Sequence, residues 1–256
     1  MAKSGKPSPK TSARVVKTNQ LPRETAKMPT PPKNWLERPA VPASDPKMRK
    51  VFWGLAAFGL VFWIGLSLGS GINADDKFQV DYSQKLVNYY GTFGKDTTAL
   101  NIPDGNMHLY GGFFETVTGF ASKTLGYQPI SIGYHNIRHA SSAILGWVAM
   151  LCAALFASLV GGQRAGIITL IIMLVSPRFV GDSMMNPKDI PFAAGYIMAI
   201  YNMVAVLDRM PNPRRWNLVG LAVGLGIALG IRAGGLLSFG MFGMFAGLHF
   251  LLQNGG

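Results

Sequence analysis

The sequence has few of the residues that build disulfide-bonded or soluble domains. Cys152 is the only cysteine, so no internal disulfide can form and no CxxC spacing for a metal or redox site exists. Only 14% of the residues are charged, whereas 49% are hydrophobic and 31 are glycines. The apolar residues come in long uncharged runs, and glycine is common in membrane helices, so this composition predicts an all-α integral membrane protein.

The formal net charge of +12 is gathered at the N-terminal end of the chain. Residues 1–50 hold 12 of the 24 Lys and Arg residues but only three of the 12 acidic ones. Residues 1–47 are also too poor in apolar residues to form a core, which predicts a disordered basic tail. A basic tail before a membrane span is typical of a cytoplasmic flank that contacts anionic lipids. No nucleic-acid-binding fold accompanies the charge, so no nucleic acid is expected as a partner.

Residues 48–256 form the predicted transmembrane module, with about six transmembrane helices. The first apolar run, residues 51–72, carries no charge over 22 residues, which is enough to cross a hydrocarbon core of about 30 Å. Arg49 and Lys50 precede this run, so the N-terminus is expected to be cytoplasmic. A tight turn is predicted at residues 161–164, and the other predicted spans are residues 140–160, 165–175, 190–206, 218–231 and 236–252.

One large loop, residues 73–138, separates the first span from the others. It is polar, mixed in charge and interrupted by Gly and Pro. Two segments in it are predicted to be short helices at the membrane surface, residues 75–90 and residues 116–125, the second starting as early as Leu109. Residues 94–104 between them are predicted to be irregular.

The predicted topology gathers the polar features on one side of the membrane. Counting from a cytoplasmic N-terminus, the large loop, residues 178–189 and Arg232 all fall on the outer face, whereas the arginines of residues 208–217 fall inside.

An acidic pair, Asp75-Asp76, opens the large loop where the first span emerges. Near lipid headgroups, desolvation and mutual repulsion favour proton uptake by one of two adjacent carboxylates, so one of them is a candidate general base for an acceptor hydroxyl. Asp182, in the second outer loop, is a candidate second acid. The alternative for the pair is structural, with one aspartate capping the helix that follows.

Four residues of the outer face are candidate ligands for a phosphate group. Arg178 offers a bidentate fork and Lys188 a point charge, and both lie in the second outer loop. Arg232, between two apolar runs, and His108, in the large loop, are the other two. The alternatives are ion pairs within the second loop, a helix cap at Asp189, and an Arg232 side chain that only reaches ordinary headgroups.

The histidine pair His135 and His139 is four residues apart, so on a helix both side chains share one face. A metal site needs a third ligand, and none is marked nearby in the sequence. The pair is therefore interpreted as interfacial, and neither a metal ligand nor a cofactor is predicted, while the need for a divalent metal ion stays open.

Taken together, these residues resemble the GT-C superfamily of membrane glycosyltransferases, in its protein O-mannosyltransferase and aminoarabinose-transferase branch. The resemblance covers residues 48 to 252 and rests on short motifs in the family's order. These are the acidic pair Asp75-Asp76, residues 178–182 (RFVGD), residues 186–189 (NPKD), and the Gly-rich residues 224–235 (GLGIALGIRAGG) with Arg232 near their end.

The resemblance implies an enzyme that moves a sugar from a polyprenyl-phosphate donor to an acceptor on the periplasmic face of a bacterial inner membrane. One acid of the pair would deprotonate the acceptor hydroxyl, and basic residues would neutralise the departing lipid phosphate. The alternative is a non-catalytic membrane scaffold or assembly subunit that keeps the same fold.

Two departures from the family's pattern are visible. The family often carries a Lys-Pro-Pro-Leu-like stretch in the first loop, and here His108-Leu109-Tyr110-Gly111-Gly112 stands in the comparable place. The family also continues beyond six spans. We therefore expect this chain to be an N-terminal module that works with a C-terminal half or a partner subunit.

Overall fold

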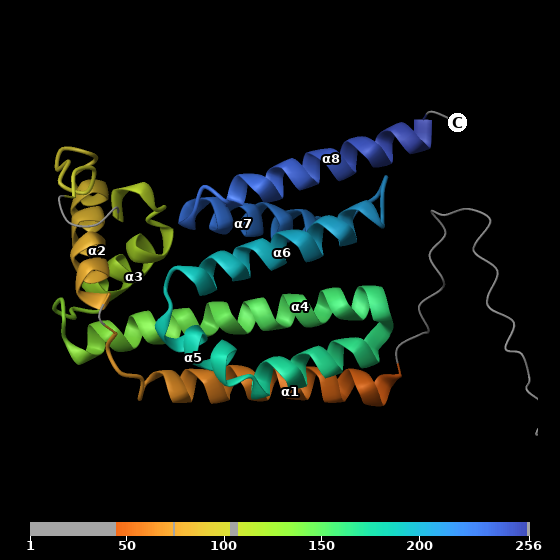
Figure 1. Cartoon of the computed structure of the whole chain (residues 1–256), viewed down its shortest axis with the longest axis horizontal. Coiled ribbons are helices and arrows are strands. Elements are labelled where there is room, and N and C mark those ends of the chain that lie inside the picture. The colour runs from red at the N-terminus through yellow and green to blue at the C-terminus, as the bar shows by residue number, and fades with distance from the viewer. Residues whose placement is uncertain (1–44, 74, 103–106, 255–256) are drawn as a thin grey trace, which may run out of the picture. The chain divides into compact units, whose positions relative to one another are not determined.

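The computed structural model describes residues 45–73, 75–102 and 107–254 (Figure 1). The predicted tail, residues 1–47, therefore lies almost entirely outside the described residues. Within the described ranges every regular element is a helix and no strand is present, which confirms the all-α class. The elements, all in the unit Val41–Gly256, are α1 (Pro46–Ser67), α2 (Asp76–Gly91), η1 (Met107–Leu109), α3 (Phe113–Thr124), α4 (Ile132–Val175), α5 (Pro177–Met185), α6 (Asp189–Leu207), α7 (Arg215–Ile231) and α8 (Gly235–Asn254).

Helix α1 is capped at its start and packs along α4. The carboxylate of Asp45 accepts a hydrogen bond from the Lys47 N–H at 2.9 Å, which satisfies one free donor of the first turn. Trp63 is fully buried in the cluster that the two helices share. Trp147 of α4 donates its indole N–H to the carbonyl of Ala56 at 2.7 Å, so α1 and α4 are joined by a polar contact as well as by apolar packing.

Helix α4 covers 44 residues and is broken once. Gly162 has φ 79° and ψ 173°, a conformation that glycine adopts without the steric cost of a Cβ atom. The chain doubles back at this point, so the two arms of α4 run in opposite directions (Figure 1). This confirms the turn predicted at residues 161–164.

Four helices among the described residues, α1, α4, α6 and α8, are long and apolar enough to cross a membrane. Helix α7 is also apolar but spans only 17 residues. The prediction of about six spans counts the two arms of α4 separately and includes α7. Length and composition therefore make this a multi-pass helical membrane protein.

Helices α6 and α7 approach each other at two glycines. A Cβ atom at Gly195 would lie 2.6 Å from the backbone nitrogen of Ala228, and one at Gly224 would lie 2.6 Å from that of Ala199. Only glycine permits such close backbone contact at these two points. This pairing holds the C-terminal end of α7 near the N-terminal end of α6.

The large loop folds onto one end of the long helices, where α4 begins and α7 ends (Figure 1). Its first helix, α2, agrees with the predicted residues 75–90. Its second helix, α3, starts at Phe113, and Met107–Leu109 form a separate short 3₁₀ turn. The predicted irregular segment 94–104 contains no helix in the part of it that the structure describes.

Two segments are more helical than predicted. Helix α4 begins at Ile132 and not at residue 140, because Ser131 caps it by accepting a hydrogen bond from the Tyr134 N–H at 3.2 Å and because Tyr134 and Arg138 find buried partners. Residues 178–189, predicted to be a loop, are mostly α5. Pro177 at the first position of α5 fits a helix start, and Pro187 follows its end.

Candidate functional site

A pocket of about 600 Å³ lies where the start of α2, helix α5 and the facing ends of α6 and α7 meet. It brings together three features that the sequence singled out separately: the acidic pair, the second outer loop and Arg232. The lining residues are Asn73, Asp75, Gln79, Tyr110, Pro177, Arg178, Gly181, Asp182, Met185, Asn186, Pro187, Lys188, Asp189 and Arg232.

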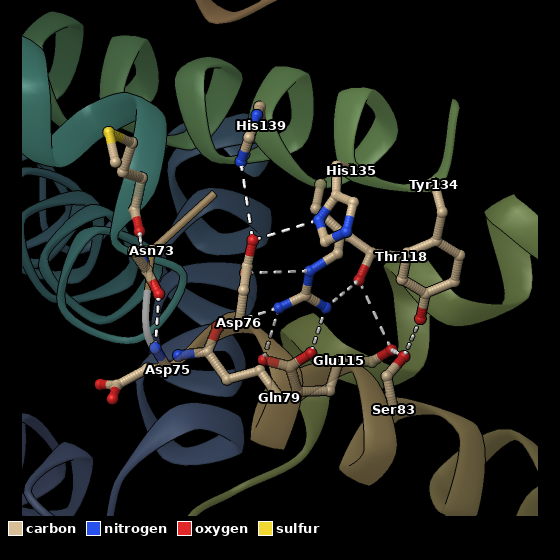
Figure 2. Close-up of polar contacts among 12 residues, drawn as sticks. Asn73, Asp75, Asp76, Gln79, Ser83, Glu115, Thr118, Tyr134, His135 and His139 are labelled. Atoms are coloured by element: carbon tan, nitrogen blue, oxygen red, sulfur yellow. Dashed lines mark hydrogen bonds and ion pairs between the residues drawn. The ribbon is translucent and has the colours of Figure 1, made fainter. Parts of the chain in front are cut away.

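The two adjacent aspartates face different surroundings. Asp75 is exposed and lines the pocket, whereas Asp76 is 3% exposed (Figure 2). Asp75 occupies the N-cap position of α2, but its carboxylate makes no capping hydrogen bond. Its N–H donates to Asn73 Oδ1 at 2.9 Å, and Asn73 Nδ2 donates to the carbonyl of Met185 at 2.8 Å. These contacts fix the backbone of Asp75 at the pocket and leave its carboxylate available.

Two of the candidate phosphate ligands are already paired with acids. Arg178 Nε lies 2.6 Å from Asp182 Oδ2, one helical turn away on α5, and the Arg178 side chain is 89% exposed. An Arg232 Nη lies 2.7 Å from Asp189 Oδ1 across the pocket. The ion pair predicted as an alternative within the second outer loop is thus present at Arg178, and Arg232 forms one with Asp189 that was not predicted, although both arginines still line the pocket.

Lys188 makes no direct ion pair with a carboxylate among the described residues, although its charge opposes the rise in pKa that burial causes at the Glu115 carboxyl. Its Nζ lies 5.1 Å from the centre of the Tyr110 ring, and the Arg232 guanidinium lies 5.6 Å from the same ring. Asp189 is the first residue of α6 and not its cap, and its N–H donates to Asn186 Oδ1 at 2.9 Å. Lys188 is thus the described cation of the pocket that is most available to a ligand.

Tyr110 reaches the pocket because the large loop touches the end of α7. The Gly111 N–H donates to the carbonyl of Ile231 at 3.0 Å. A Cβ atom at Gly111 would lie 2.1 Å from the carbonyl oxygen of Gly230, so no larger residue fits this contact. The side chain of His108, the fourth candidate phosphate ligand, lies outside the described part of the structure.

A buried ion pair anchors the large loop behind the pocket. Arg138 of α4, 2% exposed, donates to both carboxylate oxygens of Glu115 in α3 and to Gln79 Oε1 of α2 at 3.0 Å. Its guanidinium also lies 5.6 Å from the centre of the Phe114 ring. Burial raises the pKa of the Glu115 carboxyl, and the charge and hydrogen bonds of Arg138 work in the opposite direction. One side chain of α4 thus holds both loop helices.

The histidine pair acquires an acidic neighbour that the sequence analysis did not find. Asp76 Oδ2 lies 3.1 Å from His135 Nδ1 and 4.0 Å from His139 Nε2 (Figure 2). The three side chains form a cluster whose potential ligand atoms all lie within 4.8 Å of one another. The sequence marks no third ligand near the pair, and the fold brings one from α2. The spacing of four residues was the available signal, but Asp76 lies far away in the sequence.

The fold and the pocket define a multi-pass membrane protein with a charged site at one end of its helices. Residues 136–251 match the sequence model of the dolichyl-phosphate-mannose-protein mannosyltransferase family, which is a GT-C family. Its members are glycosyltransferases that use polyprenyl-phosphate sugar donors. Searches of curated proteins and of solved structures returned no match.

The matched segment contains the cations of the pocket but not Asp75. Arg178, Lys188 and Arg232 fall inside residues 136–251, whereas Asp75 and Tyr110 come from the large loop before it. The family match therefore includes three cations of the pocket and leaves out its large-loop residues.

Proposed function

We propose that this chain is a glycosyltransferase that moves a sugar from a polyprenyl-phosphate donor to an acceptor hydroxyl in the pocket beside Asp75. In the proposed topology the two arms of α4 and α7 each cross the membrane, which gives six spans from a cytoplasmic N-terminus. The pocket then opens on the outer, periplasmic face of a bacterial inner membrane, where a lipid phosphate and an acceptor can both reach it.

The proposed reaction is a displacement at the anomeric carbon of the sugar. The Asp75 carboxylate takes the proton of the acceptor hydroxyl, whose oxygen attacks that carbon. The bond from the anomeric carbon to the phosphate oxygen breaks, and the polyprenyl phosphate leaves with the electron pair. Lys188 and Arg232 stabilise the negative charge that develops on the phosphate.

The other two candidate acids, Asp182 and Asp76, are not the general base in this proposal. Asp182 orients Arg178 at the pocket rim through their ion pair, and Arg178 is the outermost of the phosphate ligands. Asp76 is buried away from the pocket, so the role of base goes to Asp75.

One observation carries the proposal. The Asp75 carboxylate, which has no hydrogen-bond or ion-pair partner in the described structure, lines the same pocket as Lys188 and Arg232, which come from distant parts of the chain. A pocket that combines a carboxylate with cations suits a substrate that brings a hydroxyl group and a phosphate, and a scaffold subunit has no need for it. The family match of residues 136–251 adds the class of donor.

The test separates donor binding from transfer. Full-length protein in detergent is titrated with geranylgeranyl phosphate, a short prenyl phosphate, and membranes containing the protein are assayed for transfer of labelled mannose from a polyprenyl-phosphate donor. Lys188→Ala should weaken phosphate binding by roughly 10- to 100-fold, the equivalent of one charge-assisted hydrogen bond. Asp75→Asn should keep phosphate binding and lower transfer by about 10²- to 10⁴-fold, the usual contribution of a general base.

Lys123→Ala, which removes an exposed lysine outside the pocket, is the matched control and should change neither measurement. If wild-type protein bound no prenyl phosphate and showed no transfer, the scaffold alternative would be preferred. An unchanged affinity in Lys188→Ala would contradict the phosphate role, and unchanged transfer in Asp75→Asn would remove that residue as the base.

A further inference from the structure

A second group of chemically active side chains lies behind the pocket and takes no part in the proposed transfer. Asp76 comes from the first turn of α2, and His135 and His139 come from the start of α4. All three are at least nine-tenths buried, with exposures of 3%, 4% and 5%. Figure 2 shows the three side chains directed toward one another.

The three side chains do not satisfy one another's hydrogen-bonding needs. Asp76 Oδ2, both ring nitrogens of His135 and Nδ1 of His139 are buried without a hydrogen-bond partner in the structure. Buried polar atoms of native proteins nearly always have a partner, so these four atoms require an explanation. Asp76 Oδ2 and His135 Nδ1 face each other at 3.1 Å, and an ion bound between them would be a partner for both.

We propose that Asp76, His135 and His139 bind one zinc-class divalent cation. Zinc binds imidazole nitrogens and carboxylate oxygens at about 2.0–2.2 Å, which places the donor atoms of a tetrahedral site about 3.4 Å apart. The distances from Asp76 Oδ2 to His135 Nδ1 and His139 Nε2, 3.1 and 4.0 Å, lie on either side of that value. Small side-chain movements bring all three atoms onto one ion.

The positive charge beside the cluster does not compete for the same oxygen. Arg138 Nε lies 3.9 Å from Asp76 Oδ1, whereas the histidines face Oδ2. The Arg138 guanidinium is itself neutralised by Glu115, to which it donates twice. Asp76 therefore divides its two oxygens between a paired arginine and the metal position.

The ligand set selects the class of metal. Two imidazoles and one carboxylate suit zinc and related transition metals, whereas magnesium and calcium prefer oxygen ligands alone. Three protein ligands leave a fourth position for water or another small ligand. The ion would fasten the first turn of α2 to α4 and so hold the neighbouring Asp75 at the pocket. It would do so whether or not the chain transfers sugar.

The experiment uses full-length protein in detergent, purified with an affinity tag that contains no histidine. Metal is removed with a chelator, and zinc or cobalt(II) is then added alone. We expect about one zinc ion per chain by elemental analysis, a higher midpoint of thermal unfolding after zinc addition, and the visible absorption of tetrahedral cobalt(II) after cobalt addition.

Three variants identify the ligands. His135→Gln and His139→Gln should each lower zinc affinity by more than the roughly 10- to 100-fold typical of removing an outer-shell partner. His249→Gln in α8, outside the cluster, is the matched control and should keep the zinc.

Wild-type protein with native helix content that binds no zinc and shows no thermal shift would overturn the proposal. Equal zinc binding by wild type and both ligand variants would also overturn it, because the ion would then be adventitious. If a ligand variant did not fold, the removal and return of zinc in the wild-type protein would still decide the question.

Discussion

Replacing Arg138 with methionine is expected to lower the free energy of unfolding by about 3–5 kcal/mol at neutral pH, the usual cost of breaking a buried ion pair. Arg138 is 2% exposed and Glu115 is 5% exposed, and two hydrogen bonds join them. At an effective dielectric constant of about 20, two charges about 4 Å apart attract by about 4 kcal/mol, which agrees with that range. The loss arises because Glu115 is left as a buried carboxylate without its partner.

The same variant should acquire a characteristic pH dependence. Burial already raises the pKa of Glu115 above its ordinary value of 4.5, and Arg138 is the main influence that lowers it. Without Arg138 the pKa rises further, so the folded state binds a proton that the unfolded state has released. The folded variant is therefore most stable below pH 4.5 and loses stability as the pH rises through the higher pKa of the folded state.

The double variant Arg138→Met with Glu115→Leu should recover most of the loss and abolish this pH dependence, because two apolar side chains replace the pair. Unfolding in mixed micelles with increasing dodecyl sulfate, followed by circular dichroism at several pH values, measures all three proteins. A single variant within about 0.5 kcal/mol of wild type, or a double variant no better than the single, would refute the idea that this ion pair anchors the loop.

Two further substitutions test how the large loop is held. Gly111→Ala places a Cβ atom 2.1 Å from the Gly230 carbonyl oxygen and should displace Tyr110, so geranylgeranyl phosphate binding should weaken about tenfold while the protein stays folded, and unchanged affinity would argue against a role for this contact. Tyr134→Phe removes the hydroxyl that donates to Ser83 Oγ at 2.8 Å and should cost about 1–3 kcal/mol in the same unfolding assay, whereas no measurable loss would mean that Ser83 finds another partner.

The helical fold was predictable from the sequence because membrane helices must be long and apolar. The run at residues 51–72 contains no charge, and α1 ends near that run's end. The turn at residues 161–164 was marked by two consecutive glycines, and Gly162 has the positive φ that glycine permits. Signals of this kind depend only on residues close together in the sequence, so they can be recognised without a structure.

The buried contacts were not predictable in the same way. The start of α4 contains Arg138 and two histidines, and their polarity suggested a loop that continues to residue 138. Their partners are Glu115 and Asp76, which lie on other helices. A periodic pattern in the sequence relates only residues a few positions apart, so it cannot reveal contacts between such distant residues. The helix extends through these residues because Arg138 and the histidines face acidic side chains of other helices, and tertiary contacts override local preference.

The separation of the acidic pair follows from the position where α2 begins. Asp75 is the N-cap residue of α2 and Asp76 is its first helical residue, and successive helical side chains point about 100° apart. With α2 packed against α3 and its first turn close to α4, one of two adjacent carboxylates must turn inward while the other faces the pocket. Asp76 turns inward and contacts Arg138 and the histidines. Asp75 lines the pocket together with Lys188 and Arg232. A shift of the helix start by one residue would remove Asp75 from the N-cap position, so the contacts that fix this start, Asn73 with Met185 and Asp76 with α4, also determine which aspartate is available to a substrate.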